Sequence, residues 1–470
     1  KERVLMKEID FEHSEYRQNK PLWKMYGHLY KGGEVLKGNA SDYLARRQKE
    51  PANVYQERLG QVFYENYVGS IIDWYVASLF RREPVILPEG EDPAGRQFLT
   101  AFIEDSDTRG TTISEFFRNA LRESLVYGTT HAVLEFPRVT NEAMTRAEEE
   151  ALGSSRAYLV HYRPDQLINW SKDERGDYEW VVLRTQRTRQ VSVSDTRMME
   201  RTRWYYYDRE NFRVYEREVA SNGIKLDLLP ASDGDIRLVD EGRHALAGER
   251  RVPLFSMPAA DGMCLMEKAS LLQLEHFNKS NALSWALTLG LFATPVVYTD
   301  REWSQVVGEA YYIQLGPNDK FGWTEPEGKV YQIAADNLTR LKEEIYRVCY
   351  LMTQAGGPSM AQSGLSKQRD FAVTQEMLRA YGDWVKDSIK RIIGVALAVR
   401  KDRIGFDVSG LDEFDLADFT TEIGDAERLL NLGIRSDTLD KQVKKKLAFQ
   451  FLSDVRQAMK ERIGQEIDGV

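Results

Sequence analysis

Between residues 336 and 355, apolar side chains recur with the period of an α-helix. They are Leu338, Leu341, Ile345, Val348 and Met352. The helix is expected to end in the sequence Ala355-Gly356-Gly357-Pro358, because two glycines and a proline cannot continue it. A second helical pattern occupies 371–403, and its apolar positions are Phe371, Leu378, Tyr381, Val385, Ile389, Ile392, Ala396 and Val399.

The segment between these helices, residues 356–370, is polar and is expected to form a loop. Its glycines are expected to act as hinges, and its other polar side chains could contact a phosphate backbone without reading base sequence. The hinges are Gly356, Gly357 and Gly364, and the polar side chains are Ser359, Gln362, Ser363, Lys367 and Arg369. Two cations on a loop are more often a solvated connection. Two long helices that hold up this loop nevertheless favour presentation of the loop to a partner over a catalytic pocket.

The remaining pattern mixes helices with one long stretch of period two. Residues 1–50 are mostly polar and are expected to form an arm, and one strong helix is expected over 53–79. Thr112 and Glu115 have the spacing of a capping box for a helix that ends before Gly128.

From 157 to 254 the alternation predicts an antiparallel meander of strands, so the fold class is α+β. The run Tyr205-Tyr206-Tyr207 could stack on nucleic-acid bases, although aromatic residues in a strand more often serve packing.

A helix over 265–291 and a small insert over 292–335 complete the middle of the chain. The insert has too little mass for a large core of its own and is rich in aromatic residues, among them Trp303, Tyr311, Tyr312, Phe321 and Trp323. Residues 425–470 are expected to be helical. Helices 265–291 and 371–399 carry apolar residues on more than one face, which is more than a monomer surface accommodates and predicts an oligomer.

Composition narrows the function classes. The chain has 470 residues, enough for two or three domains, with 64 basic against 73 acidic residues and a net charge of −9. This balance argues against a general nucleic-acid coat protein. Two cysteines, Cys264 and Cys349, do not support a disulfide framework or a Cys-ligated zinc site. No apolar run reaches membrane-spanning length and the first residues are charged, so we expect a soluble intracellular protein without membrane contact.

Catalytic and cofactor motifs are weak. The sequence contains no phosphate-binding Walker A loop and no G-x-S-x-G elbow, and its six scattered histidines are expected to be structural. Asp319, Glu327 and Lys329 resemble the acidic and E-x-K pattern of a Mg²⁺-dependent nuclease. Pro326 and Gly328 indicate a turn there instead of the buried strand such a motif needs. No enzyme activity, cofactor or metal is therefore expected, and the nuclease stays as an alternative.

Three stretches, together with the order of elements, resemble the portal proteins of tailed bacteriophages. The stretches are Pro164-Asp165-Gln166-Leu167-Ile168-Asn169-Trp170 with the following strand Val181-Val182-Leu183-Arg184, the helix from Leu271 into Phe292-Ala293-Thr294-Pro295, and Phe321-Gly322-Trp323-Thr324-Glu325-Pro326-Glu327-Gly328. The likeness covers most of residues 50–450. It implies an N-terminal arm and wing (1–264), a first stem helix (265–291), a clip (292–335), a second stem helix (336–355), a tunnel loop (356–370), a long wing helix with a strand (371–424) and a short crown (425–470).

The resemblance further implies a mechanical role. Portal proteins form a ring, here expected to be a dodecamer, at one capsid vertex of the virion, after assembly in the host cytoplasm. Double-stranded DNA passes through the ring without sequence recognition, and a separate terminase large subunit supplies ATP hydrolysis. The other implied partners are a head-to-tail adaptor and the major capsid protein or scaffold. A non-ring minor capsid or head-completion protein is the structural alternative to the portal.

Overall fold

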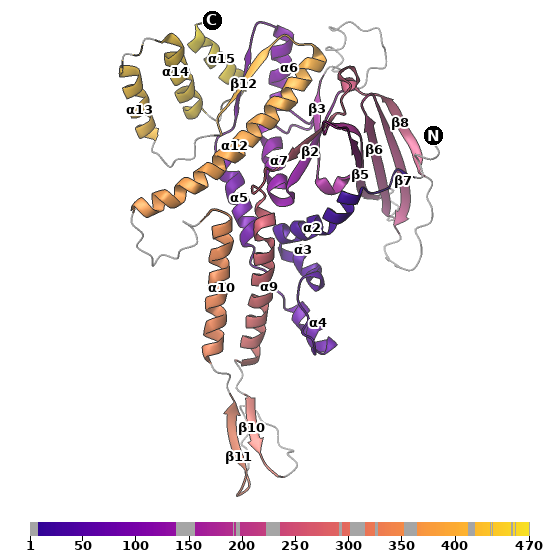
Figure 1. The fold of residues 1–470 in the computed structure, drawn as a ribbon, viewed down its shortest axis with the longest axis vertical. Helices are drawn as coiled ribbons and strands as arrows, with labels where there is room; N and C mark the ends of the chain where they lie inside the picture. Colours follow the sequence, from indigo (N-terminus) through magenta and orange to yellow (C-terminus); the bar gives the residue numbers. More distant parts are fainter. Residues whose placement is uncertain are drawn as a thin grey trace. The chain divides into compact units, whose positions relative to one another are not determined.

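The computed structural model is a mixed α+β fold, as the sequence predicts (Figure 1). It describes residues 8–137, 156–190, 192–193, 198–221, 236–290, 294–300, 315–324, 328–351, 364–411, 419–432, 434, 436–452, 455 and 457–469. The chain divides into two compact units. The larger comprises Lys1–Gly27, Ile72–Glu267 and Ala372–Val470, and the smaller comprises His28–Ile71 and Lys268–Phe371.

Two antiparallel sheets form the centre of the larger unit. The five-stranded sheet has the order β4-β5-β6-β7-β8, which confirms the predicted meander. Its strands are Leu167–Lys172, Tyr178–Gln190, Met198–Asp208, Asn211–Ser221 and Arg237–Arg243. The three-stranded sheet has the order β3-β2-β9, with strands Tyr158–Tyr162, Thr129–Glu135 and Leu254–Pro258. Short 3₁₀ turns occur at Pro164–Gln166 and Ala245–Glu249.

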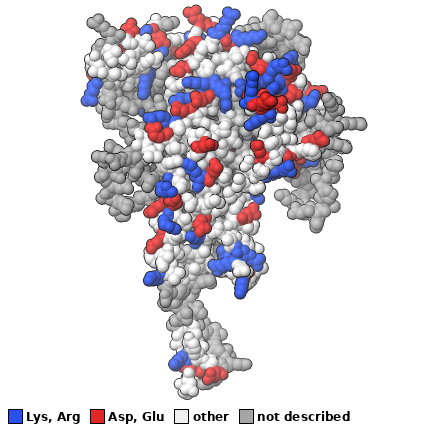
Figure 2. Space-filling view, in the orientation of Figure 1, with Lys and Arg blue, Asp and Glu red and all other residues white. Residues whose placement is uncertain are grey.

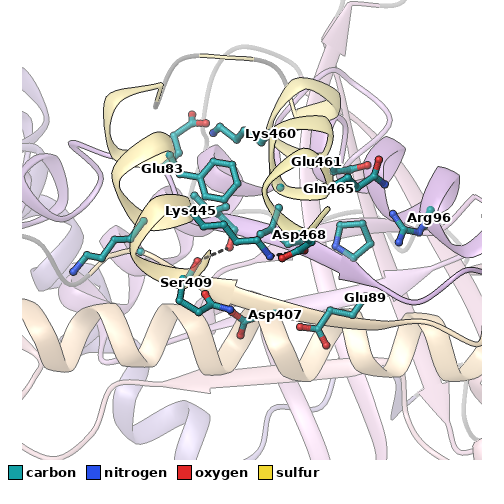
Figure 3. Close-up of a pocket in the computed structure, with 18 of the residues that line it drawn as sticks. Glu83, Glu89, Arg96, Asp407, Ser409, Lys445, Lys460, Glu461, Gln465 and Asp468 are labelled. Atoms are coloured by element: carbon teal, nitrogen blue, oxygen red, sulfur yellow. Dashed lines mark hydrogen bonds and ion pairs between the residues drawn. The ribbon is translucent and has the colours of Figure 1, made fainter. Parts of the chain in front are cut away.

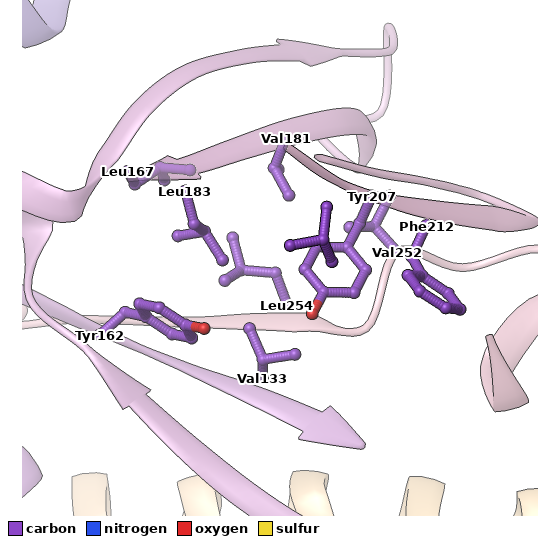
Figure 4. Packing of buried hydrophobic residues seen from close by; sticks show 10 residues of the cluster. Val133, Tyr162, Leu167, Val181, Leu183, Tyr207, Phe212, Val252 and Leu254 are labelled. Atoms are coloured by element: carbon purple, nitrogen blue, oxygen red, sulfur yellow. The ribbon is translucent and has the colours of Figure 1, made fainter. Parts of the chain in front are cut away.

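A hydrophobic core lies between these two sheets (Figure 4). Val181 and Leu183 of β5 and Tyr207 of β6 are buried against Val133 of β2 and Leu254 of β9. The prediction that the aromatic run Tyr205-Tyr206-Tyr207 serves packing is confirmed. Besides Tyr207, the two neighbouring tyrosines of this run pack on the two core clusters that cover opposite faces of the five-stranded sheet.

The opposite face of the five-stranded sheet is covered by the N-terminal region. Helix α2, Ser14–Lys31, places Tyr16 against Trp204 and Tyr215. The expectation of a polar arm over 1–50 is therefore wrong for the described part of that segment, because α2 and the short α3, Gly33–Gly38, are helical. Aromatic side chains that bury one stripe of α2 explain the difference.

The other secondary elements of the larger unit follow the predicted pattern more closely. Helix α7, Ile113–Tyr127, begins with the Thr112 side chain accepting a hydrogen bond from Glu115 N, which is the Thr112 half of the predicted capping box. It ends at left-handed Gly128, which confirms the predicted stop. Two short strands of this unit, β1 Val85–Glu89 and β12 Gly405–Ser409, pair antiparallel. The unit also contains four helices of 12 to 15 residues: α6 Pro93–Glu104, α13 Phe419–Asn431, α14 Asp437–Phe451 and α15 Gln457–Asp468.

The 37-residue helix α12, Gly364–Arg400, lies along the outer edge of β9. Trp384 Nε1 donates to Pro258 O at 2.8 Å, and Arg391 Nη2 donates to Ser256 O at 2.7 Å. The helix thus satisfies carbonyl groups that an edge strand leaves unpaired. Its apolar residues from Leu378 to Leu397 are mostly buried in the same unit. The inference that the apolar surplus of 371–399 serves an oligomer contact is therefore wrong for this stretch.

The smaller unit is dominated by two helices, α9 (Leu265–Gly290) and α10 (Gly328–Val348). The α9 bounds match the predicted helix to within one residue. Helix α10 begins eight residues before the predicted start, because Lys329, Gln332 and the neighbouring alanines are good helix formers. It ends at Val348, seven residues before the predicted end, and Tyr350 after it has a positive φ of 60°. The remaining elements are η1 Ala40–Asp42, α4 Ala52–Gly60, β10 Thr294–Tyr298 and β11 Lys320–Thr324, with β10 and β11 paired antiparallel. Helix α5, Tyr67–Leu79, begins in the smaller unit and continues from Ile72 in the larger.

Two glycines of α12 offer a matched test of this packing. A Cβ at Gly382 would overlap Leu411 O, whereas one at Gly394 would meet nothing within 4 Å. We predict that Gly382→Ala destabilises the protein by about 1–3 kcal/mol through overpacking, while Gly394→Ala stabilises it by about 0.5–1 kcal/mol. Denaturant unfolding of both variants measures the difference. Equal stabilities would contradict the contact between α12 and the turn at Leu411.

Candidate functional site: two antiparallel helices and the start of a third

Helices α9 and α10 run antiparallel in contact with each other. Lys268 near the start of α9 contacts Tyr350 just after the end of α10. Further along α9, Lys279 contacts residue 337 and Ala286 contacts residue 331, so the contacts move back toward the start of α10. Lys268 Nζ donates to the Tyr350 hydroxyl at 2.6 Å and lies 4.3 Å from the ring centroid. At 1.5 Å per residue, the 26 residues of α9 span about 39 Å and the 21 of α10 about 31 Å.

Only part of the apolar surface of this helix pair is buried. Leu341 and Ile345 of α10, two of the predicted apolar positions, are buried, and so is Cys349 just after the helix. Leu271 of α9 is 73% exposed, and Val330 and Ile333 of α10 are 64% and 60% exposed. Val330 and Ile333 are three residues apart and therefore neighbours on the helix surface. The pair thus presents large apolar side chains that nothing in its own unit covers.

A row of polar side chains on α9 binds the backbone of residues 43–68. Asn281 Oδ1 accepts from Phe63 N at 3.1 Å, and its Nδ2 donates to Phe63 O at 3.0 Å. Gln273 Oε1 accepts from the backbone N–H groups of Tyr67 and Val68, and its Nε2 donates to Glu65 O at 2.8 Å. Gln273 therefore supplies the acceptor that the first N–H groups of α5 lack within the helix.

These contacts explain why the single helix expected over 53–79 is wrong. Residues 61–66 separate α4 from α5, because backbone groups of Phe63 and Glu65 are bonded to side chains of α9. Asn278 adds two bonds to the same region, accepting from Ala45 N at 2.8 Å and donating to Tyr43 O at 3.1 Å. The sequence reasoning missed this row, although its signal was present as polar residues at helical spacing within an otherwise apolar helix.

His276 is the buried titratable group of this row. Burial lowers the pKa of His276, while Glu65, whose carboxylate lies 3.6 Å from Nε2, acts in the opposite direction. The Tyr67 ring packs edge-on against the imidazole, and burial raises the pKa of Tyr67 to about 12. His276 therefore stays neutral near pH 7, and its imidazole packs against the Tyr67 ring.

The sequence-predicted site residues fall into three groups. Gly364, Lys367 and Arg369 belong to α12, so the expected loop over 356–370 is wrong from residue 364 onward. Good helix formers at 365 and 367–369 explain the longer helix. Phe321 and Trp323 lie on strand β11. The others lie outside the described residues: Gly356, Gly357, Ser359, Gln362, Ser363, Trp303, Tyr311 and Tyr312.

The nuclease pattern is not assembled in the described part of this region. Asp319 Oδ2 accepts a hydrogen bond from Gly316 N at 2.8 Å, as in a turn, and Lys329 is the second residue of helix α10. Glu327 lies outside the described residues. Among the residues that the structure describes, no group of three or more His, Cys, Asp or Glu side chains could hold a metal ion. No described helix is long and apolar enough to span a membrane.

The larger unit contains a pocket of about 620 Å³ between the β1–β12 pair and helices α14 and α15 (Figure 3). Lys445 Nζ pairs with Asp468 at 2.6 Å across it, and Lys460 is buried in its wall. Cations and carboxylates line it in equal number, so it selects no charge class of ligand. They are Arg82, Arg96, Lys445, Lys446 and Lys460 against Glu83, Glu89, Asp407, Glu461 and Asp468.

Comparison with known proteins gives distant matches to solved structures only. No family model and no curated protein matches the chain. One similar structure is the neck of an empty GTA particle computed with C6 symmetry, at 12% identity and TM-score 0.41, covering 79% of this chain and 88% of that chain. Another is the virion of a native gene transfer agent (GTA) particle, at 11% identity and TM-score 0.40, covering 84% and 94%. A third is the neck of a native GTA particle computed with C12 symmetry, at 12% identity and TM-score 0.38, covering 87% and 99%.

The amide contacts of α9 lead to a prediction for the smaller unit. Asn281→Leu removes both partners of Phe63 and leaves its part-buried backbone groups unpaired, so we expect a loss of about 2–4 kcal/mol in unfolding free energy. Amide hydrogen exchange should accelerate at residues 61–68. The control is Asn337→Leu, which removes only an exposed contact with Lys279 and should cost less than about 0.5 kcal/mol. Equal effects of the two changes would contradict the role of Asn281.

Proposed function

We propose that the chain is the subunit of a phage-type portal ring, through which double-stranded DNA enters and leaves a capsid. The observation that carries this proposal is the succession of α9, a β-hairpin, α10 and the 37-residue α12. In the family that the sequence resembles, this order corresponds to stem helix, clip, stem helix and long wing helix. The meander of β4–β8 corresponds to the wing.

The exposed apolar side chains of the stem support assembly of several copies. Leu271, Val330 and Ile333 are large and more than half exposed, and their burial against a neighbouring copy would remove apolar area from water. A contact between different surfaces of identical copies closes into a ring when a full rotation satisfies it. A dodecamer is the number that the family resemblance implies.

The other partners follow from this assignment. The β10–β11 hairpin, with Phe321 and Trp323 on β11, would serve as the clip on which the terminase large subunit and then the head-to-tail adaptor dock. The wing would face the major capsid protein or scaffold at the capsid vertex. Hydrolysis of ATP would belong to the terminase, because the sequence contains no Walker A loop.

Ring formation gives the first test. We expect mass photometry of the wild-type protein to show a large closed assembly, and Val330→Asp with Ile333→Asp to reduce it to monomers with an unchanged circular dichroism spectrum. Placing two carboxylates in an apolar contact carries a desolvation penalty that no partner offsets.

The matched control for ring formation is Phe11→Asp with Leu22→Asp, which alters two exposed apolar side chains of the larger unit. This variant should retain the ring. A wild-type protein that stays monomeric across salt and protein concentrations would refute the portal assignment. Intact rings in the Val330/Ile333 variant would move the subunit contact away from α10.

DNA transport gives the second test. We expect Lys367→Ala with Arg369→Ala to leave rings intact but to lower the yield of DNA-filled heads, since removal of two cations weakens salt-dependent contacts with phosphates. Arg379→Ala with Lys390→Ala removes the same charge from α12 further along and should fill heads normally. Wild-type filling by the Lys367/Arg369 variant would assign those two cations to a solvated helix start.

A further inference from the structure

The outer half of the five-stranded sheet carries five arginines and two glutamates on one face. The register pairs Arg187 with Arg201, Arg201 with Glu218, Arg203 with Glu216, and Glu216 with Arg237, and paired residues share a face. Arg189 belongs to the same face as Arg187 because side chains alternate along a strand. We name this set the arginine face: Arg187, Arg189, Arg201, Arg203 and Arg237, with Glu216 and Glu218.

The two glutamates hold most of these arginines in fixed positions. Glu216, with a side chain only 4% exposed, accepts from Arg203 Nε at 2.6 Å and from Arg237 Nη2 at 2.8 Å. Glu218 pairs with Arg201 at 2.7 Å and with Arg189 at 3.2 Å. Each guanidinium carries five N–H donors, so these contacts leave further donors directed away from the glutamates. The face therefore offers ordered guanidinium groups with spare donors and three more positive than negative charges.

Arg187 differs from the other arginines of this face, which pair with Glu216 or Glu218. It is exposed and lies directly opposite Arg201, and like charges at directly opposed positions destabilise a sheet. No hydrogen bond or ion pair joins Arg187 to any other residue that the structure describes. Glu218 and Glu216 compensate the charge of Arg201, at 2.7 and 3.6 Å, whereas no described carboxylate pairs with Arg187. A bound anion would supply the partner that Arg187 lacks. Positions that break a local rule in this way are often functional.

The exposed apolar side chains on the same strands do not extend this face. Met198 on β6 and Leu238 on β8 are 39% and 37% exposed, but the register pairs them with Ser221 and Tyr215, which places both on the opposite face of the sheet. Cationic and anionic side chains are interspersed over the face drawn in Figure 2, so the sign of charge alone does not single out this place. The directly opposed pair Arg187 and Arg201 does.

We propose that the arginine face binds an acidic segment of another protein. Carboxylates fit because Glu216 and Glu218 already occupy equivalent positions between guanidinium groups on the same surface. A surplus of three charges matches a short segment with about three carboxylates. A nucleic acid is less well matched, because specific DNA complexes commonly use about six to ten phosphate contacts and the chain as a whole carries a net charge of −9.

The test uses the purified full-length protein with two fluorescent probes, a ten-residue alternating Glu-Ser peptide and a 20-base-pair DNA duplex. We expect low-salt fluorescence anisotropy to show peptide binding that weakens with added salt. Arg187→Glu should weaken it at least about tenfold, because a favourable contact is replaced by a repulsive one. The same change should leave the melting temperature equal or higher, since the introduced carboxylate would face Arg201 as an opposite charge.

Arg175→Glu is the matched control. Arg175 is exposed in the turn between β4 and β5, so this change alters the net charge equally outside the arginine face. Unchanged peptide affinity in this variant together with loss in Arg187→Glu would establish the site. Equal losses in both variants, or no loss in either, would overturn the proposal. If the duplex bound more tightly than the peptide, and Arg187→Glu abolished that binding, the ligand of the arginine face would be a nucleic acid and not an acidic segment. Each outcome is independent of ring formation, which mass photometry measures separately.

Discussion

The smaller unit depends on the match between side-chain amides of α9 and backbone groups of residues 63–68. An amide carries a donor and an acceptor, as a peptide group does, so Asn281 can satisfy both groups of Phe63. Gln273 does the same for Glu65 and the first turn of α5. Without these bonds the segment would have to leave buried polar groups unpaired or continue as a helix. The row thus decides where α5 begins and places Tyr67 beside His276 and Tyr346.

An analogous constraint organises the larger unit, where a long helix satisfies the edge of a sheet. Trp384 and Arg391 are seven residues apart, which is two helical turns, and they donate to carbonyl groups two residues apart on β9. Tyr381 adds a bond to Met263 O at 3.0 Å and packs edge-on against Tyr75 of α5. Three side chains on one stripe of α12 therefore fix the helix by polar contacts in addition to burial. Because this stripe holds α12 against the larger unit, most apolar residues of the helix are buried within the chain itself.

Strong local signals were sufficient to predict much of this fold. The cap at Thr112, the stop at Gly128, the meander and the bounds of α9 each follow from residues within a few positions of the element. The failures concern elements that distant residues determine. The break between α4 and α5 depends on side chains more than 200 positions later, which no window along the sequence contains. The loop predicted before α12 was wrong for a different reason. The glycines of this segment indicated a loop, whereas the helix-forming residues that follow Gly364 extend α12 to that position.

For the candidate site, sequence alone located the helices but not their surfaces. Periodicity found the buried stripe of α10 at Leu341 and Ile345, yet it could not show that Val330 and Ile333 remain uncovered, since exposure depends on what packs nearby. The arginine face was equally invisible, because its members come from four strands and only the register brings them together.

In the amide row and at the edge of β9, backbone polar groups are matched with side-chain partners. Against that background, a like-charge pair such as Arg187 and Arg201 and an uncovered apolar pair such as Val330 and Ile333 are exceptions. Both are unfavourable in an isolated chain, the first through repulsion and the second through exposed apolar area. A second molecule can remove each cost, an anion in the first case and an apolar surface in the second. Both features are therefore places where a second molecule would lower the free energy of the protein.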